Sequence, residues 1–281
     1  MVLTLALSLP GLLKPRAVLT APAFFLKKEG ATIGEAFAGE EFTYRVGFWV
    51  FDDVAEAKIR LSKDPESSDY IVTLKAHTTG LIAWLRERED VYTARLREVD
   101  GGKRFVTVTF EKNVKIGSKT RRTRTVLDHE DGLMTWKKWK RGKERKGKGG
   151  EFEMVPGVFY DGPLTAFYNF RYGVYGQVGE GKDFKITTFP KDGGENVDIT
   201  LKIATEEEYE RRKPDWTTPA DYLADVRLDK DLFDSRSGKV EMLFNGGLVP
   251  VEAVAKDILF FGDVRGKLVE LGVDMDFEKA L

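Results

Sequence analysis

Apolar and polar residues alternate with a period of two through most of this 281-residue chain. The alternation is clear at residues 42–50, 55–61, 70–76 and 91–97, which are also rich in β-branched and aromatic residues. A period of two places the apolar side chains on one face of a strand, so these segments predict antiparallel strands with one solvated face. Further strands are predicted at residues 104–112, 121–128, 133–140, 183–189, 196–204, 222–229, 239–244, 249–259 and 263–271.

Short turn signals separate the predicted strands. Clusters of Asp, Gly, Pro and Ser occur at residues 52–53, 64–68, 100–102, 131–132 and 192–194. Residues of these types favour tight turns, and so many short strands with tight connections predict a curled sheet, a barrel or a pair of packed sheets. We therefore expect a mainly β protein, with a single antiparallel curled sheet or β-barrel-like domain.

One segment breaks the alternation. Residues 162–172 carry large side chains at helical spacing, with Pro163 near the first turn and Asp161 ahead of them as a candidate N-cap. This pattern predicts one short helix that plugs or flanks the sheet. A second helical stretch, at residues 206–212, is highly charged and is interpreted as a solvated turn.

The composition excludes several kinds of site. Without Cys, the chain has no disulfide, no thiolate nucleophile, no Cys-ligated zinc or iron–sulfur cluster and no lipid-modified cysteine. A hydrophobic content of 42% indicates a folded chain, and 45 basic residues nearly balance 46 acidic ones. We expect no cofactor and no metal ion.

The first residues bear on the compartment. Residues 2–13 are almost wholly apolar and are followed by Lys14 and Arg16. This run is shorter than the ~20 residues that span a bilayer, but it fits the apolar stretch of a secretory signal peptide. Residues 1–23 are therefore interpreted as a signal peptide or an apolar N-terminal arm. We expect a periplasmic or otherwise exported protein, with a cytoplasmic location as the alternative.

Several short motifs occur in order along the chain. They are GEEFTYRV at 39–46, AEA at 55–57, DGPLTAFYNFR at 161–171, and GKV, VPVE and FGDV between 238 and 264. Over about residues 37–271 the chain resembles domain of unknown function 3108, a bacterial family of predicted exported proteins. The resemblance implies a single antiparallel β domain in the periplasm or outer envelope of Gram-negative bacteria, and it implies no established activity.

The resemblance leaves residues 272–281 as a C-terminal tail. It also marks one departure, because the family commonly has a paired Asp-Asp in its late hairpin. This chain has FNGGL at residues 244–248 instead. No role assigned to those acids is carried over to this chain.

Histidine and serine chemistry has little support in the sequence. His77 and His129 lie far apart, and no G-x-S-x-G motif surrounds a serine. No pair of histidines, or of a histidine and a carboxylate, has the spacing of zinc ligands on a helix. The Gly176–Gly181 stretch joins a predicted helix to a strand, the reverse of the order that nucleotide binding requires.

Carboxylates are plentiful. Asp52 and Asp53 are adjacent, Glu206–Glu208 form a run, and Asp161 precedes the predicted helix. A carboxylate-dependent hydrolase acting on an envelope glycan is therefore one alternative, although turn formation and solubility account for most of these acids. We expect structural roles for Asp161 and for Arg171, which lies near the helix end or turns inward to pair with a strand acid.

The charge is distributed unevenly. Residues 112–148 hold fourteen Lys and Arg against four Asp and Glu, a net charge of about +10. A hairpin of residues 120–128 and 133–140 is expected to collect this charge on one face or rim, with two tryptophans close by. The candidate anion-binding residues are Arg121, Arg122, Arg124, Trp136, Lys137, Lys138, Trp139, Lys140 and Arg141. The alternative is a solvated hairpin whose charge is balanced by acids elsewhere.

Aromatic residues provide the second candidate surface. They are numerous enough either to fill a closed core or to line a concavity that holds an acyl chain. The candidate residues of such a concavity are Trp49, Trp84, Phe167, Tyr168 and Phe170.

These observations favour a non-catalytic envelope protein. Its expected ligand is a lipid, a lipoprotein or an anionic envelope component, and peripheral membrane contact is compatible with the basic hairpin. Nucleic acid is not an expected partner, because no recognition motif is present. A structural interaction module for an outer-membrane partner is a further alternative, and the oligomeric state is left open.

Overall fold

The computed structural model describes residues 30–48, 51–80, 87–189, 198–232, 234–259 and 261–273. The predicted signal peptide or N-terminal arm lies outside the described residues, as does most of the predicted C-terminal tail. The last strand ends at Val273, two residues inside that predicted tail.

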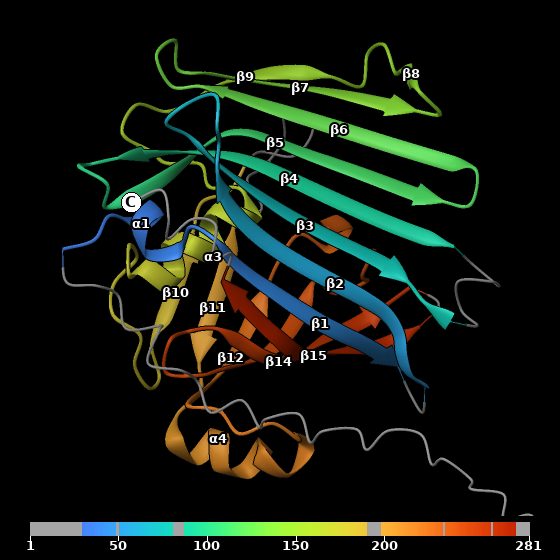
Figure 1. Cartoon of the computed structure of the whole chain (residues 1–281), viewed down its shortest axis with the longest axis vertical. Helices are drawn as coiled ribbons and strands as arrows, with labels where there is room; N and C mark the ends of the chain where they lie inside the picture. The colour runs from blue at the N-terminus through green and yellow to red at the C-terminus, as the bar shows by residue number, and fades with distance from the viewer. Residues whose placement is uncertain are drawn as a thin grey trace, which may run out of the picture.

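The described chain is dominated by one antiparallel sheet (Figure 1). Its longer strands are β1 (Glu40–Phe48), β2 (Phe51–Lys63), β3 (Tyr70–Thr78), β4 (Arg88–Val99), β5 (Arg104–Ile116), β6 (Lys119–Asp128), β7 (Leu133–Lys140), β12 (Tyr222–Arg227), β13 (Lys239–Phe244), β14 (Pro250–Ile258) and β15 (Gly262–Val273). The shorter ones are β8 (Lys143–Glu144), β9 (Gly150–Glu153), β10 (Asp183–Ile186) and β11 (Ile199–Ile203).

The strand order shows how the two halves of the chain join. The order is β10-β11-β12-β13-β14-β15-β1-β2-β3-β4-β5-β6-β7-β8, with β9 paired to β7. The last strand, β15, therefore pairs with the first, β1, and the sheet is open between β10 and the β7–β9 edge. The mainly β, single-sheet prediction is confirmed, and the sheet is curled but not closed.

The predicted helix is present as α3 (Pro163–Tyr172). Pro163 occupies its first turn, where a missing N–H costs nothing, and Gly173 ends it with a left-handed φ of 88°. The N-cap residue is Gly162, and no side chain caps this end. The expectation that Asp161 caps the helix is therefore wrong, because its carboxylate is engaged elsewhere.

Helix α3 lies inside the curl and divides the core. Leu164 and Tyr168 pack with β2–β5 in one cluster of buried residues, whereas Ala166 and Phe170 pack with β10–β13 in another. Full burial of a Leu or Phe side chain, such as Leu164 or Phe170, contributes roughly 1.5–3 kcal/mol. The helix thus connects the two halves of the sheet through its opposite faces.

Among the described residues, two further α-helices flank the sheet. Helix α1 (Ile33–Phe37) begins at a capping box formed by Thr32 and Glu35. Helix α4 (Glu206–Arg212) is a short helix with its own capping box, where a solvated turn was expected. The segment after it covers a small apolar cluster on the outer face of β12–β15. Among the described residues, no helix combines the length and apolarity needed to cross a lipid bilayer.

Candidate functional site

The pairing of β5, β6 and β7 divides the basic stretch between the two faces of the sheet. Arg121 lies opposite Lys140, and Thr123 lies between Lys112 and Lys138. Directly paired residues share a face, so these bases point into the curl with Thr123. The side chains one residue along each strand, which include Arg122, Arg124 and Lys137, point outward. The bases are therefore not collected on a single face, because the strand period of two separates neighbouring bases.

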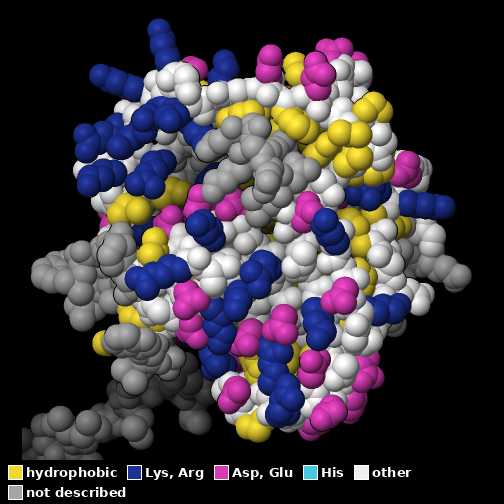
Figure 2. Space-filling model, turned by 180° about the vertical axis from the view of Figure 1, so that it is seen from behind, with side chains coloured by type: hydrophobic (Ala, Val, Ile, Leu, Met, Phe, Trp, Pro, Cys, Tyr) yellow, Lys and Arg dark blue, Asp and Glu magenta, His cyan; other side chains and the backbone are white. Residues whose placement is uncertain are grey.

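The outward row carries its own interactions. Arg122 donates to Glu111 at 2.5 Å, and its guanidinium lies 4.9 Å from the ring centre of Trp139. Arg124 and Lys137 face each other across β6 and β7, and both are exposed. In Figure 2, Lys and Arg side chains gather at the upper left of the molecule, where the ends of β6, β7 and β8 meet.

A cavity of about 510 Å³ lies on the inner face of β5–β7. Its opposite wall is formed by Leu228, Asp229, Asp231, Leu232 and Asp234 of the connection between β12 and β13. The apolar lining residues are Phe110, Val114, Trp136, Pro163, Phe189, Ile199, Leu228 and Leu232. The polar ones are Lys112, Arg121, Thr123, Thr125, Lys138, Thr188, Asp229, Asp231 and Asp234. We call this space the β5–β7 cavity.

Lys112 holds the two walls of the β5–β7 cavity together. Its Nζ donates to the backbone carbonyls of Asp231 and Leu232, at 2.7 Å each. Burial lowers the pKa of Lys112, although nearby Asp90 and Asp234 oppose the shift. The hydroxyl of Tyr92 donates to the same Leu232 carbonyl. Side chains of β4 and β5 therefore hold the β12–β13 connection in place on the inner side of the sheet, although the edge strands of the sheet do not pair with each other.

The charges of the two walls differ. On the β6–β7 wall the charged side chains are the bases Arg121 and Lys138. The acids lie on the opposite wall, where Asp234 pairs with Arg88 at 2.9 Å. An anionic group in the cavity is therefore best placed against β6 and β7.

The described residues of the predicted aromatic concavity pack against other side chains. Tyr168 and Phe170 are buried in the two core clusters, and the ring centre of Phe167 lies 6.3 Å from that of Phe42. Trp49 and Trp84 lie outside the described residues. Of the predicted site residues, Arg121, Trp136 and Lys138 line the β5–β7 cavity.

Asp161 is a buried junction between α3 and β5. Its Oδ2 accepts hydrogen bonds from Arg104 at 2.6 Å and from Tyr175 at 2.5 Å. Asn169 also donates to it at 3.3 Å and bonds to the backbone of Phe105 through both ends of its amide. Burial raises the pKa of Asp161, while Arg104 and the hydrogen bonds lower it. These contacts fix α3 against the sheet.

Arg171 forms the second buried junction. It turns inward and donates to both carboxylate oxygens of Glu40 on β1, at 2.7 and 3.1 Å. Its guanidinium also lies 4.5–5.7 Å from the ring centres of Phe37, Phe42, Phe167 and Tyr168. Arg171 therefore has the arrangement of a buried partner for a strand acid.

The acids considered for hydrolysis are separated in the fold. Asp161 is buried beside α3, whereas Asp53 is exposed near the β1–β2 turn and pairs with Arg45 at 3.0 Å. Glu206–Glu208 lie on α4, and nothing is described of the Asp52 side chain. His129 Nε2 lies 2.8 Å from the carbonyl of Thr107. Within the described ranges, no group of three or more His, Asp or Glu is arranged to hold a metal ion.

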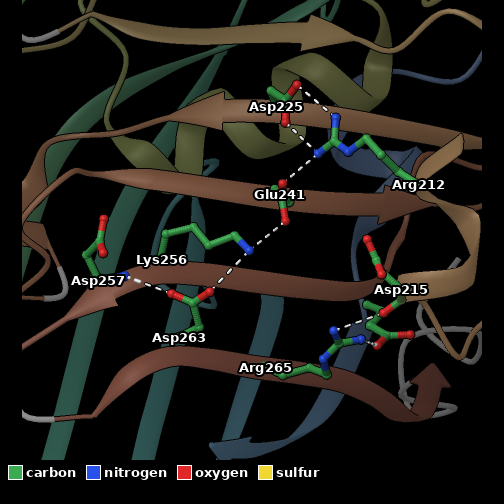
Figure 3. Close-up of polar contacts among 9 residues, drawn as sticks. Arg212, Asp215, Asp225, Glu241, Lys256, Asp257, Asp263 and Arg265 are labelled. Atoms are coloured by element: carbon green, nitrogen blue, oxygen red, sulfur yellow. Dashed lines mark hydrogen bonds and ion pairs between the residues drawn. The ribbon is translucent and has the colours of Figure 1, made fainter. Parts of the chain in front are cut away.

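The structure also contains a charge network that the sequence did not indicate (Figure 3). Arg212 of α4 forms a double hydrogen bond with Asp225 of β12 at 2.8 and 3.0 Å, and it reaches Glu241 of β13 at 2.7 Å. Lys256 of β14 then bridges Glu241 and Asp263 of β15, at 2.9 and 3.2 Å. The network fastens α4 to four neighbouring strands on the outer face.

The family is settled by a sequence comparison. The family model described as "Protein of unknown function (DUF3108)" matches residues 43–214, more than half of the chain. The chain belongs to the DUF3108 family. The match spans the strands of the β5–β7 cavity and helix α3, so the cavity's basic wall lies within the family region.

A structural comparison matches this chain to two solved structures from other families of unknown function. A β-barrel-like protein of domain of unknown function DUF1849 from Brucella abortus is 13% identical, with a TM-score of 0.48, over 85% of this DUF3108 chain and 98% of its own. A DUF1089 family protein from Pseudomonas aeruginosa is 12% identical, with a TM-score of 0.33, over 73% and 91% of the two chains. A search of the curated proteins found no match.

Sequence reasoning missed several residues that shape the site. Lys112 was counted among the bases, but nothing in the sequence indicated that it reaches the distant β12–β13 connection. Glu40 and Arg104 were likewise not identified as partners of Arg171 and Asp161. The division of the bases had a usable signal, because Arg122 and Arg124 alternate with Thr123 and Thr125.

Proposed function

We propose that this DUF3108 chain is a non-catalytic binding protein of the cell envelope, and that its ligand is an anionic amphiphile. The ligand class is an acyl chain with a carboxylate or phosphate head. The observation that carries the proposal is the β5–β7 cavity, which combines an apolar lining with two bases on one wall. Its volume lies within the range of roughly 300–1,000 Å³ that is usual for small-molecule sites.

The lining suggests how such a ligand lies. Phe110, Trp136 and Leu232 offer an apolar surface for the chain. Arg121 and Lys138 project from adjacent strands on the same face and offer donors for the head group. Among the described residues, no ion-pair partner is found for Arg121. Its guanidinium is therefore well suited to a ligand carboxylate or phosphate.

Binding of a fluorescent fatty acid tests this proposal. The double variant Arg121→Gln/Lys138→Gln removes the inner bases, whereas Arg124→Gln/Lys137→Gln removes two bases from the outer face of the same strands. We expect the inner variant to bind the fatty acid at least roughly tenfold more weakly, since a hydrogen bond to a charged group contributes about 1.5–3 kcal/mol. The outer variant should bind like the parent.

The methyl ester of the same probe separates charge from apolar contact. It lacks the carboxylate, so the parent and the inner variant should bind it equally. The proposal is contradicted if the parent binds neither probe, or if the inner and outer variants lose the same affinity. Unchanged unfolding midpoints of both variants show that the fold is retained.

An interaction module for another envelope protein is the second candidate. It is favoured by an exposed apolar loop after β9, in which Val155, Val158 and Phe159 are 53%, 40% and 40% exposed. Cross-linking in cells should then recover one dominant protein, and Val155→Ser should abolish its recovery without changing fatty-acid binding. Recovery that is unaffected by Val155→Ser would exclude this loop.

A further inference from the structure

The antiparallel order brings several turns to one end of the sheet. The β1–β2 turn follows Phe48, and Phe48 also pairs with Val264 beside the β14–β15 turn. The β5–β6 turn follows Ile116, which pairs with Arg88 and Lys119. The β7–β8 turn lies at the same end, on the right of Figure 1. These turns are distant in sequence but share one end of the molecule.

Two of the turns form an aromatic cluster. The ring centre of Phe48 lies 5.7 Å from that of Phe51 and 5.0 Å from that of Phe261. Phe51 is 49% exposed, and the neighbouring Leu259 is 37% exposed. Large apolar side chains at hairpin ends bury little area within the molecule and are free to contact another phase. The nearby Asp53 is paired with Arg45, which limits its repulsion of an anionic surface.

The β7–β8 end supplies positive charge. Residues 140–148 contain six Lys and Arg and one Glu, and every one of these charged side chains is exposed. Arg141 and Gly142 form the turn with φ values of 52° and 74°, as a type I′ hairpin requires. The tight turn places Arg141 at the tip. We call this end, with Phe48, Phe51, Leu259, Phe261 and residues 140–148, the basic–aromatic rim.

We infer that the basic–aromatic rim docks the protein onto an anionic lipid bilayer. Aromatic side chains favour the bilayer interface, and each Lys or Arg near an anionic surface contributes about 1 kcal/mol. Neither contribution alone gives firm binding, but apolar contact and basic charge together do. The rim goes beyond the proposed function, because its residues are distinct from those that line the β5–β7 cavity.

The inference is tested by co-sedimentation of the full chain with vesicles. The vesicles contain phosphatidylcholine alone or phosphatidylcholine mixed with phosphatidylglycerol. We expect binding only to the mixed vesicles, and weaker binding at high salt. Phe51→Ser/Leu259→Ser and, separately, Lys143→Gln/Lys146→Gln should each lower the affinity by roughly tenfold.

Matched controls lie at the opposite end of the sheet. Phe159 is also 40% exposed, but it packs on Arg104 at the far end of β5. Lys63 and Lys103 are exposed at the far ends of β2 and β5. The variants Phe159→Ser and Lys63→Gln/Lys103→Gln should sediment with mixed vesicles like the parent.

Three results would overturn the inference. The first is that the parent does not sediment with mixed vesicles, and the second is that the rim and control variants lose the same affinity for them. The third is that the rim variants still sediment with the vesicles but no longer capture a protein that the parent captures from a cell extract. If the double Phe51→Ser/Leu259→Ser variant has a lowered unfolding midpoint, the single Phe51→Ser variant replaces it. Fatty-acid binding by the rim variants should equal that of the parent, so failure of the rim and failure of the cavity are distinguishable.

Discussion

The variant Arg171→Met removes both hydrogen bonds that join α3 to Glu40 of β1. In the parent these bonds measure 2.7 and 3.1 Å, and the two side chains are only 1% and 6% exposed. Methionine keeps most of the apolar volume but leaves the Glu40 carboxylate buried without its counter-charge. Breaking a buried ion pair in this way lowers the free energy of unfolding by about 3–5 kcal/mol. That is a large part of the ~5–15 kcal/mol typical of a folded protein.

Guanidinium unfolding followed by circular dichroism measures this loss. The double variant Glu40→Gln/Arg171→Met should recover more than half of it, because no unpaired charge then stays buried. Arg45→Met serves as the control, since Arg45 and Asp53 are about half exposed and their pair contributes roughly 0–1 kcal/mol. A loss below ~1 kcal/mol for Arg171→Met, or no recovery in the double variant, would refute the reasoning.

Three further predictions concern other contacts. Lys112→Met should speed amide hydrogen exchange in residues 228–232, because both hydrogen bonds from Lys112 to the β12–β13 connection are lost. Unchanged exchange would show that Lys112 does not hold this connection in place. Desolvation raises the pKa of Glu252, but hydrogen bonds from Thr218 and Arg265 outweigh it, so the folded-state pKa is lowered overall. The ionised Glu252 therefore stabilises the fold at pH values above its unfolded-state pKa, and this stabilisation is lost as the pH falls through the lower folded-state pKa. Glu252→Gln should therefore flatten the acid limb of stability in thermal unfolding, and an unchanged limb would exclude this role. Gly34→Ala should lower the free energy of unfolding by about 1–3 kcal/mol, because the new methyl group collides with the Tyr70 ring. An unchanged free energy in chemical unfolding would show that α1 shifts freely.

The local sequence pattern was sufficient to predict the position of most strands and of helix α3. The period of two located the strands, because side chains on one face of this sheet are solvated and those on the other are not. The helix at residues 163–172 was recognisable from Pro163 and the change of period. The family resemblance was carried by the same segments, and the family is confirmed.

Long-range contacts were beyond such patterns. Nothing local to Arg171 indicates that Glu40, 131 residues earlier, is its partner. Similarly, Lys112 resembles any other base of its stretch until the connection 120 residues later is placed against it. The aromatic residues favoured a filled core over a lined concavity, but the sequence did not exclude the concavity. Residues on both sides of α3 pack into the core, and the β5–β7 cavity lies elsewhere, between β5–β7 and the β12–β13 connection.

Occupation of the β5–β7 cavity is the central claim, and photolabelling tests it most directly. A fatty acid with a diazirine near the middle of its chain is bound to the full protein, irradiated, and located by peptide mass spectrometry. We predict labels on the inner residues of β5–β7, such as Phe110 and Trp136, and on the facing Leu228 and Leu232. Excess unlabelled fatty acid should suppress these labels. Labels spread over the outer surface, or labels that excess fatty acid does not suppress, would contradict the account.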